Sequence, residues 1–330
     1  MGFRALLTER AEDGTISSAV RMLDDAQLPD GDVNVAIEWA GLNYKDGLCL
    51  TGQGGLVRAY PHIAGIDFAG IVHESSDSRY APGDAVVLTG WRVGETHWGG
   101  YAERARVKAD WLVPLPKGLS TRDAMVIGTA GLTAMLAINR LETLGLTPSS
   151  GEVLVSGAAG GVGSIAIALL ARLGYDATAL SGRPEHAEML RNLGAKTILE
   201  RGDFLGQPDK VLESARFAAA IDCVGGDVLG KLLRQIAYGG AVAALGNAAG
   251  IALNTNVLPF ILRGVTLAGI DSVMQPYAAR VAAWTRLAGL FDFSAYAGNV
   301  EEVGLAELPE KAAQILQGQV RGRVLVDPGR

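Results

Sequence analysis

The stretch that most constrains the fold is a short apolar run that passes into a glycine-rich segment and then into an apolar helical pattern. The run starts at Glu152, the glycine-rich segment is Gly157–Ser164, and the helical pattern reads IAIALLARLG. Glycines at a strand-to-helix turn let backbone N–H groups approach a pyrophosphate, which the positive end of the helix attracts. We interpret the segment as a dinucleotide-binding turn. Its GxxGGxG order departs from GxGxxG, and glycines also mark tight turns in α/β proteins generally, which leaves a purely structural alternative.

The alternation of short apolar runs with Ala-rich helical stretches begins at about Asp123 and continues to VTLAGID. Strand, helix and strand in repeated order imply right-handed crossovers and a parallel sheet with helices on both faces. We therefore predict an α/β protein in which residues 123–291 form a doubly wound, Rossmann-type domain.

The first third of the chain has a different texture. Short β-like runs lie at Asp32–Ala40, Ile66–Glu74, Gly83–Gly90 and Tyr101–Val107, without long helical periods between them. This spacing is typical of a compact antiparallel or barrel-like unit. The tail ends in GRVLVDP, which predicts one more strand. We expect the tail to return to the first domain, so that this domain comprises residues 1–122 and 292–330.

The end of the second strand in such a domain indicates which dinucleotide is bound. A carboxylate there would favour NAD, whereas this chain has Ser181, Gly182 and Arg183. The serine offers a hydroxyl, and the arginine offers a permanently charged planar fork that suits phosphate oxygens. The predicted cofactor is therefore NADPH. The alternative is that Arg183 is a solvated residue at a helix start before Pro184.

Composition excludes several classes of protein. The net charge of −6 argues against nonspecific nucleic-acid binding, and two distant cysteines cannot build a disulfide framework or a four-cysteine zinc site. Four histidines without paired spacings predict no metal site. No uninterrupted apolar run approaches the ~18 residues of a membrane span. We expect a cytoplasmic protein with a small-molecule substrate.

A dense polar set, Gly41–Asp46, interrupts two apolar stretches of the first domain. Polar loops held by a rigid scaffold commonly carry function. Here Tyr44 could donate a proton or a hydrogen bond, and Lys45 could hold a phosphate. The structural alternative is a helix start, with Asn43 as its cap and Asp46 in its first turn. The two interpretations are compatible.

Several segments together carry a family resemblance: NYKD, PHIAGIDFAG, LTGWRVGETHWGG, GTAGLTAM, SGAAGGVGS, SGR, AIDCVGG and PFILRGVTLAGIDSVM. Over essentially the whole chain the sequence resembles the zinc-free branch of the medium-chain dehydrogenase/reductase superfamily, and most closely its NADPH-dependent acryloyl-CoA reductases. The resemblance implies a GroES-like β-barrel domain, a Rossmann domain, a cleft between them and a homodimer.

The resemblance also implies roles for single residues. It makes Tyr44, Asn43 and Asp46 the candidate catalytic set, with Tyr44 beside the nicotinamide. The candidate cofactor-binding residues are Tyr44, Ala159, Gly160, Gly161, Val162, Ser181, Gly182, Arg183, Asn247, Ile261, Ser272 and Arg323. Zinc-binding relatives have a catalytic cysteine where Asn43 stands, so no metal site is implied.

The implied reaction is reduction of acryloyl-CoA to propanoyl-CoA. Hydride from NADPH would reach the β-carbon, negative charge would move onto the thioester oxygen, and the α-carbon would take a proton from Tyr44 or from water. The candidate contacts for coenzyme A phosphates are Lys45, Arg58, Arg92 and Arg104. Two alternatives stay open: an NADPH-dependent quinone or free-enone oxidoreductase, and a non-enzymatic NADPH-binding structural or sensor protein.

Overall fold

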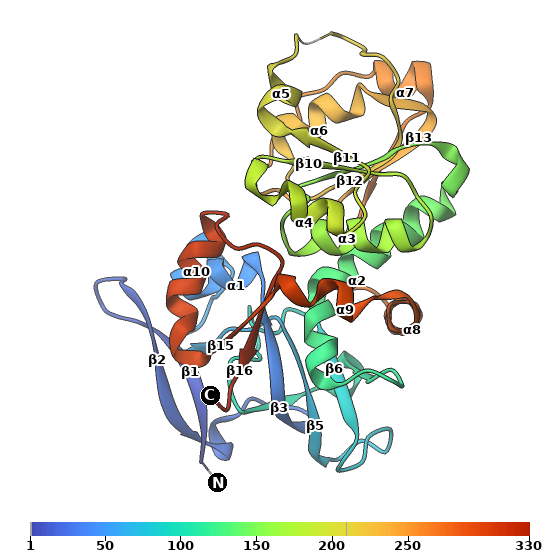
Figure 1. Cartoon of the computed structure of the whole chain (residues 1–330). Coiled ribbons are helices and arrows are strands. Elements are labelled where there is room, and N and C mark those ends of the chain that lie inside the picture. The colour runs from blue at the N-terminus through green and yellow to red at the C-terminus, as the bar shows by residue number, and fades with distance from the viewer. Residues whose placement is uncertain (1, 209) are drawn as a thin grey trace. The chain divides into compact units, whose positions relative to one another are not determined.

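The computed structural model describes residues 2–208 and 210–330, which divide into two compact units (Figure 1). The first unit comprises the chain up to Ala130 together with Ser272–Ala288 and Asn299–Arg330, and the second comprises Gly131–Asp271 and Gly289–Gly298. The predicted division into residues 1–122 and 292–330 against 123–291 stays a prediction about which segments fold together.

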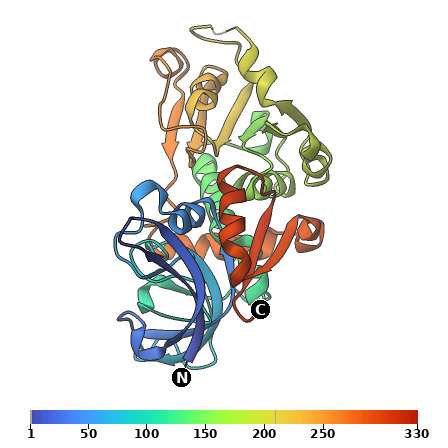
Figure 2. The ribbon, with the colours of Figure 1, turned by 90° about the vertical axis from the view of Figure 1, so that its left-hand side faces the viewer.

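The first unit is built mainly of antiparallel strands. One sheet has the order β15-β16-β3-β5-β6-β8, with β7 also paired to β3, and a smaller sheet has the order β2-β1-β4. Figure 2 shows the curved β1–β2 hairpin at the N-terminal end. The strands are β1 (Gly2–Arg10), β2 (Ile16–Asp24), β3 (Val33–Leu42), β4 (His62–Ile63), β5 (Asp67–Ser75), β6 (Ala85–Thr89), β7 (Arg104–Val107), β8 (Leu112–Pro114), β15 (Val300–Gly304) and β16 (Arg323–Asp327).

The last strand, β16, pairs antiparallel with β3, where Val324 lies opposite Leu42. The expected strand in the tail is therefore present, and it lies in the first unit. Helices α1 (Tyr44–Thr51) and α10 (Leu308–Leu316) pack against each other, and α8 spans Tyr277–Leu290. Gly47 makes the close approach of α1 and α10 possible, because a Cβ there would lie 2.9 Å from the Ile315 side chain.

The second unit is a parallel sheet with the order β11-β10-β9-β12-β13-β14, which confirms the predicted doubly wound α/β fold. Its strands are β9 (Val153–Ser156), β10 (Ala177–Ser181), β11 (Thr197–Glu200), β12 (Phe217–Asp222), β13 (Ile236–Ala244) and β14 (Thr266–Gly269). Its helices are α3 (Gly161–Arg172), α4 (Ala187–Asn192), α5 (Arg201–Gly206), α6 (Gly226–Leu233), α7 (Leu258–Arg263) and α9 (Phe293–Tyr296). Strand β9 lies between β10 and β12, so the strand order reverses beside it, which is where such sheets bind ligands.

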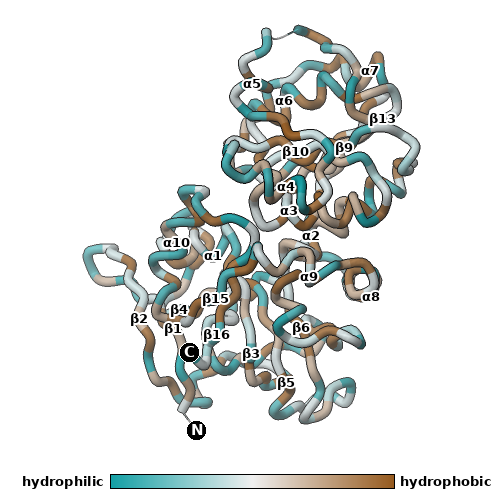
Figure 3. Tube along the Cα trace, in the orientation of Figure 1, coloured by the Kyte–Doolittle hydropathy of each residue, from teal (hydrophilic) through white to brown (hydrophobic). Residues whose placement is uncertain are grey.

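Each unit has a core of buried hydrophobic residues. Figure 3 colours the Cα trace of both units by hydropathy. Phe3, Phe68 and Leu88 are buried in the core of the first unit, and the completely buried residues Phe217 and Leu232 lie in a core of the second. Strands β3 and β5 supply apolar residues to the first core, among them Val35 and Phe68. Strand β9 is buried at every position, because helices cover a parallel sheet on both faces.

Helix α2 (Thr121–Thr143) starts in the first unit and ends in the second. It kinks at Gly128, where φ is 52° and ψ is −159°. Within the described residues it is the one helix long and apolar enough to cross a membrane, but 83% of its most apolar window is buried in the protein. That degree of burial is typical of a core helix.

Candidate functional site

The glycine-rich turn of the second unit joins β9 to α3. Gly157 has a φ of 59°, and a Cβ at Gly163 would lie only 2.4 Å from the carbonyl oxygen of Gly157. Glycine is therefore required at 157 by backbone conformation and at 163 by close packing of the helix on the turn. Ala159–Val162 follow at the start of α3, where the first N–H groups of a helix have no intrahelical acceptor and can bind an anion. The N–H of Gly160 is already engaged, because it donates to the carbonyl oxygen of Gly157 at 3.0 Å.

Ser181, Gly182 and Arg183 follow β10, the strand next to β9. Leu180 pairs with Ser156, and its carbonyl accepts a hydrogen bond from the N–H of Ala158 at 3.2 Å. The structure thus brings the turn of Ser181–Arg183 and the glycine-rich turn to the same edge of the sheet, the one formed by the carboxyl ends of its strands. The Ser181 hydroxyl accepts from the N–H of Arg183 at 3.1 Å and so shapes the turn. The Arg183 guanidinium has no hydrogen-bonding partner within residues 2–208 and 210–330.

A second arginine, Arg201, lies against the same turn, and the sequence analysis did not predict it as a site residue. A Cβ on Gly182 would lie 2.8 Å from Cζ of Arg201, so the missing side chain leaves room for that guanidinium. The parallel register explains the position: Ser181 pairs with Glu200, and Arg201 comes directly after it. The signal was present, because neighbouring parallel strands end at the same edge. Two guanidinium groups make this edge a candidate phosphate site.

Two further predicted cofactor residues of this unit stay predictions. Asn247 is exposed in the loop after β13, where its Cα would lie 3.2 Å from a Cβ on Gly225. That loop follows the carboxyl end of a strand, as the glycine turn does. Ile261 is 68% exposed on α7, whose last residue, Arg263, donates to the carbonyl oxygen of Ile236 at the start of β13. The position of α7 gives no support to a shared site with the glycine turn.

Ser156 is the last residue of β9 and Asp222 the last residue of the adjacent strand β12, and a buried hydrogen bond joins their side chains. The Ser156 hydroxyl donates to Asp222 Oδ1 at 2.6 Å and accepts from the N–H of Cys223 at 2.9 Å. Burial is the main cause that raises the pKa of Asp222. These contacts occupy the serine hydroxyl and fix the two strand ends beside the glycine turn.

In the first unit, Tyr44 begins α1 and is 40% exposed, so its ring is open to a ligand. Asn43 precedes it as the N-cap, and Asp46 completes a capping box by accepting from the N–H of Asn43 at 2.9 Å. The other carboxylate oxygen of Asp46 accepts from the N–H groups of Gly65 and Ile66 at 3.1 and 2.9 Å. The predicted helix start is present. Asp46 is 0% exposed, which supports a positioning role and gives no support to its predicted catalytic contact.

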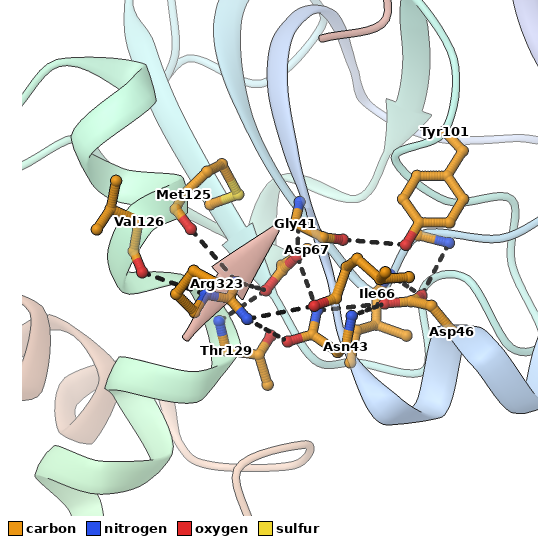
Figure 4. A network of polar contacts seen from close by, with 12 residues as sticks. Gly41, Asn43, Asp46, Ile66, Asp67, Tyr101, Met125, Val126, Thr129 and Arg323 are labelled. Atoms are coloured by element: carbon orange, nitrogen blue, oxygen red, sulfur yellow. Dashed lines mark hydrogen bonds and ion pairs between the residues drawn. The ribbon is translucent and has the colours of Figure 1, made fainter. Parts of the chain in front are cut away.

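Asn43 also contacts a buried ion pair (Figure 4). Its Nδ2 donates to Asp67 Oδ1 and its Oδ1 accepts from Arg323 Nη1, both at 3.1 Å. Arg323 Nη2 lies 3.9 Å from Asp67 Oδ2, and the side chains are 2% and 0% exposed. Arg323 was predicted to contact the cofactor, and that role stays a prediction. Its guanidinium is enclosed by partners within the first unit.

The buried carboxylate of Asp46 makes stability depend on pH. Burial, and then the negative charge of Asp67, raise the pKa of Asp46 from 3.8 to about 7. Between these values the folded chain keeps a proton that the unfolded chain has released. We therefore expect the contribution of Asp46 to stability to fall as pH rises from 3.8 to about 7, by roughly 1.4 kcal/mol per pH unit where the two states differ by one proton.

Urea unfolding of wild type and of the Asp46→Asn variant across this pH range checks the expectation. The variant has no group that titrates at this position, so the difference between the two unfolding free energies isolates Asp46. Curves that run parallel through the whole range would contradict the raised pKa.

Two of the four candidate coenzyme A contacts have carboxylate partners. Lys45 Nζ lies 2.8 Å from Glu95 Oε1, and Arg104 Nη1 lies 3.0 Å from Asp25 Oδ2. Arg58 and Arg92 are exposed and form no ion pair within the part of the chain that the structure describes. They are the stronger candidates for an anionic ligand, because their charge is not already compensated.

Ser272 belongs to a segment that a buried arginine holds in place. Arg280, 1% exposed, donates from Nη2 to the carbonyls of Ser272 and Val273, and from Nη1 to the carbonyl of Thr89. Its guanidinium also lies 4.8 Å from the ring centroid of Trp91. Trp91 and Arg92 have φ values of 57° and 58°, an uncommon conformation for residues with side chains. Arg280 thus ties the Ser272 segment to a strained turn that carries Arg92.

The described residues do not offer a metal site. No three His, Cys, Asp or Glu side chains among them gather as a possible metal-binding group. The start of the NYKD segment is Asn43, whose amide is already engaged by Asp46, Asp67 and Arg323.

Comparison with known proteins relates both units to one group of enzymes. Residues 29–117 match the alcohol dehydrogenase GroES-like domain, and residues 161–287 match the family described as zinc-binding dehydrogenase. The family description mentions zinc, but the residues that the structure describes do not include a group of His, Cys, Asp or Glu side chains that could bind it. The acrylyl-CoA reductase AcuI of Ruegeria pomeroyi is 55% identical over 98% of this chain and 99% of its own length.

Two solved structures share the whole architecture. The yhdH oxidoreductase of Salmonella enterica in complex with NADP has a TM-score of 0.95 and 53% identity, covering 98% of this chain and 99% of that one. The Bacillus subtilis protein yhfP with NAD bound has a TM-score of 0.95 and 44% identity, covering 99% of both chains.

Proposed function

Because this chain belongs to the medium-chain dehydrogenase/reductase superfamily, we propose that it uses NADPH to reduce the α,β-double bond of acryloyl-CoA, giving propanoyl-CoA. The relative from R. pomeroyi that bears this activity in its name is 55% identical over nearly the full length of both chains. The relative from S. enterica, 53% identical, was solved with NADP.

The cofactor assignment rests on one observation: two guanidinium groups lie together at the carboxyl ends of β10 and β11. Arg183 and Arg201 flank Gly182, and no carboxylate occupies the position that would bind the ribose of NAD. The negatively charged 2′-phosphate of NADPH suits these two guanidinium groups. Ala159–Val162 at the start of α3 would hold the pyrophosphate.

The chemistry requires few groups from the protein. NADPH, when bound, supplies a hydride for a carbon that is conjugated to the thioester carbonyl. Tyr44 has an exposed phenol, which we propose supplies a hydrogen bond or a proton to the reacting atoms. Asn43 and Asp46 fix the start of the helix that carries it. Arg58 and Arg92 are proposed to hold phosphates of coenzyme A. No step is assigned to zinc.

The enzymatic alternative is reduction of a quinone or a free enone. This reaction needs the same reduced cofactor but no residues that bind the phosphates of coenzyme A. Arg58 and Arg92, which have no ion-pair partner among the described residues, therefore favour the acyl-CoA substrate. The non-enzymatic alternative is an NADPH-binding structural or sensor protein, which turnover of any enoyl thioester would exclude.

Initial rates with acryloyl-CoA, crotonyl-CoA, longer enoyl-CoA esters and a quinone, each with NADPH and then NADH, test the proposal. We expect the highest kcat/KM for acryloyl-CoA with NADPH, and a KM for the thioester that rises with salt because its phosphates are held by exposed charges. A higher kcat/KM for the quinone, or equal values with the two cofactors, would contradict the proposal.

A homodimer and a cytoplasmic location are further parts of the proposal. The second unit ends its sheet in the edge strand β14, and large apolar residues are exposed on β13 and α7, among them Tyr238, Ile261 and Leu262. Exposed apolar surface next to an open sheet edge suits a subunit interface.

A further inference from the structure

The guanidinium of Arg323 is a buried group that the proposed chemistry does not use directly. Nε donates to the carbonyl of Val126 at 3.2 Å and Nη2 to that of Met125 at 3.3 Å. On its other side, Nη1 donates to the carbonyl of Leu42 at 3.3 Å and to Oδ1 of Asn43 at 3.1 Å. One planar group therefore joins helix α2 to the turn before α1.

The attachment to α2 follows from the kink at Gly128. In a regular helix the N–H of Thr129 would donate to the carbonyl of Met125. Here that N–H donates to Oδ2 of Asp67 at 2.6 Å, while the freed carbonyl accepts from Arg323. The ion pair replaces the broken helix bond with one side-chain partner for each backbone group, which fixes the guanidinium firmly.

The attachment to α1 runs through the Asn43 amide. Its oxygen faces Arg323, and its nitrogen donates to Asp67 Oδ1 at 3.1 Å and to Asp46 Oδ2 at 3.2 Å. The cation of Arg323 on one side and the accepting carboxyl oxygens of Asp67 and Asp46 on the other favour this one orientation of the amide. Asn43 is the cap of α1, and the next residue is Tyr44.

Two glycines leave the space that the pair occupies. A Cβ at Gly41 would lie 2.6 Å from both Arg323 Nη2 and Asp67 Oδ1, and a Cβ at Gly128 would lie 2.5 Å from Arg323 Nη2. The backbone on both sides of the ion pair is thus shaped to admit a guanidinium at this place.

We propose that Arg323 is a positioning residue for Tyr44: anchored at the α2 kink and by Asp67, it fixes the Asn43 amide and hence the start of α1. The inference deepens the proposed function and rests on its assignment of Tyr44 to the reacting end of the cofactor. Arg323 acts through Tyr44 and touches neither substrate nor cofactor.

A double-mutant cycle of Arg323→Lys and Tyr44→Phe tests the proposal. A lysine keeps the charge, but its single ammonium cannot span the carbonyls of α2 and the Asn43 amide together. We expect Arg323→Lys to lower kcat for acryloyl-CoA about tenfold or more when Tyr44 is present. In the Tyr44→Phe background the same change should lower kcat less than about twofold, because the positioned hydroxyl is already gone.

Arg280→Lys is the matched control, since Arg280 is a buried arginine of the same unit with several main-chain acceptors and no bond to Asn43. Its effect on kcat should be equal with and without the Tyr44 hydroxyl. Equal effects of Arg323→Lys in the two backgrounds would overturn the proposal, and so would an unchanged kcat in Tyr44→Phe. If Arg323→Lys does not fold, Asn43→Ala takes its place in the cycle with the same expected outcomes.

Wild-type turnover separates this proposal from the proposed function. If wild type does not reduce acryloyl-CoA, the substrate assignment fails, and the cycle is then measured on the dissociation constant of NADPH. Coupling between positions 323 and 44 in that constant would support the positioning role, and additive effects would overturn it.

Discussion

Replacing Arg183 with alanine is expected to weaken NADPH binding about 10- to 150-fold, since hydrogen bonds to charged groups contribute roughly 1.5–3 kcal/mol. NADH binding should change little, because NADH lacks the phosphate that the guanidinium would meet. The Arg183 guanidinium has no competing partner among the residues that the structure describes, so its whole hydrogen-bonding capacity is open to a ligand. Fluorescence titration of both cofactors measures the two dissociation constants.

Arg201→Ala should show the same selectivity, because the Arg201 guanidinium lies over Gly182 on the other side of the turn. Arg191→Ala is a suitable control on the same unit, since this exposed arginine lies in the last turn of α4 and is not part of the strand edge. Equal weakening of NADPH and NADH by Arg183→Ala would contradict the assignment of the phosphate site. If Arg191→Ala weakened NADPH binding as much as Arg183→Ala, the effect would come from the net charge of the protein and not from a contact with the phosphate.

Replacing Gly128 with alanine is expected to destabilise the first unit by roughly 2–6 kcal/mol, the sum of backbone strain and overpacking. The φ of 52° and ψ of −159° at Gly128 lie in a region that residues with a Cβ avoid. The added methyl group would also lie 2.5 Å from Arg323 Nη2 and 2.9 Å from Asp67 Oδ2. Urea unfolding of the variant and of wild type gives the difference.

Gly118→Ala separates the two causes. Gly118 has a φ of 90° in the same unit, but a Cβ there would meet no atom within 4 Å. Its cost should be limited to the backbone conformation, about 1 kcal/mol or slightly more. If the two alanine variants were equally stable, the crowding around the ion pair would contribute nothing.

The parts of the fold that follow from local patterns could be predicted from the sequence. Short apolar runs that alternate with Ala-rich helical stretches indicated the parallel sheet, and Gly157–Ser164 marked the turn beside the strand where the order reverses. The capping of α1 by Asn43 and Asp46 was also readable, because a cap depends on residues only three positions apart. Family membership is confirmed along nearly the whole chain.

The parts that were not predictable depend on contacts between distant residues. Arg323 meets Asn43 across 280 positions, and no spacing rule connects them. Nothing in the residues next to Gly128 marks the kink of α2, because its partners, Asp67 and Arg323, lie far away in the sequence. Lys45 was open to a phosphate by its sequence position, and its pairing with Glu95 depends on how a loop 50 residues away folds back.

The interruption of α2 also gives the chain a built-in reporter. The amide proton of Thr129 is protected by a carboxylate of β5 rather than by its own helix, and that carboxylate is held by an arginine of the final strand. We therefore expect release of the C-terminal strand to raise deuterium uptake at this one amide, while the helical turns on either side stay closed.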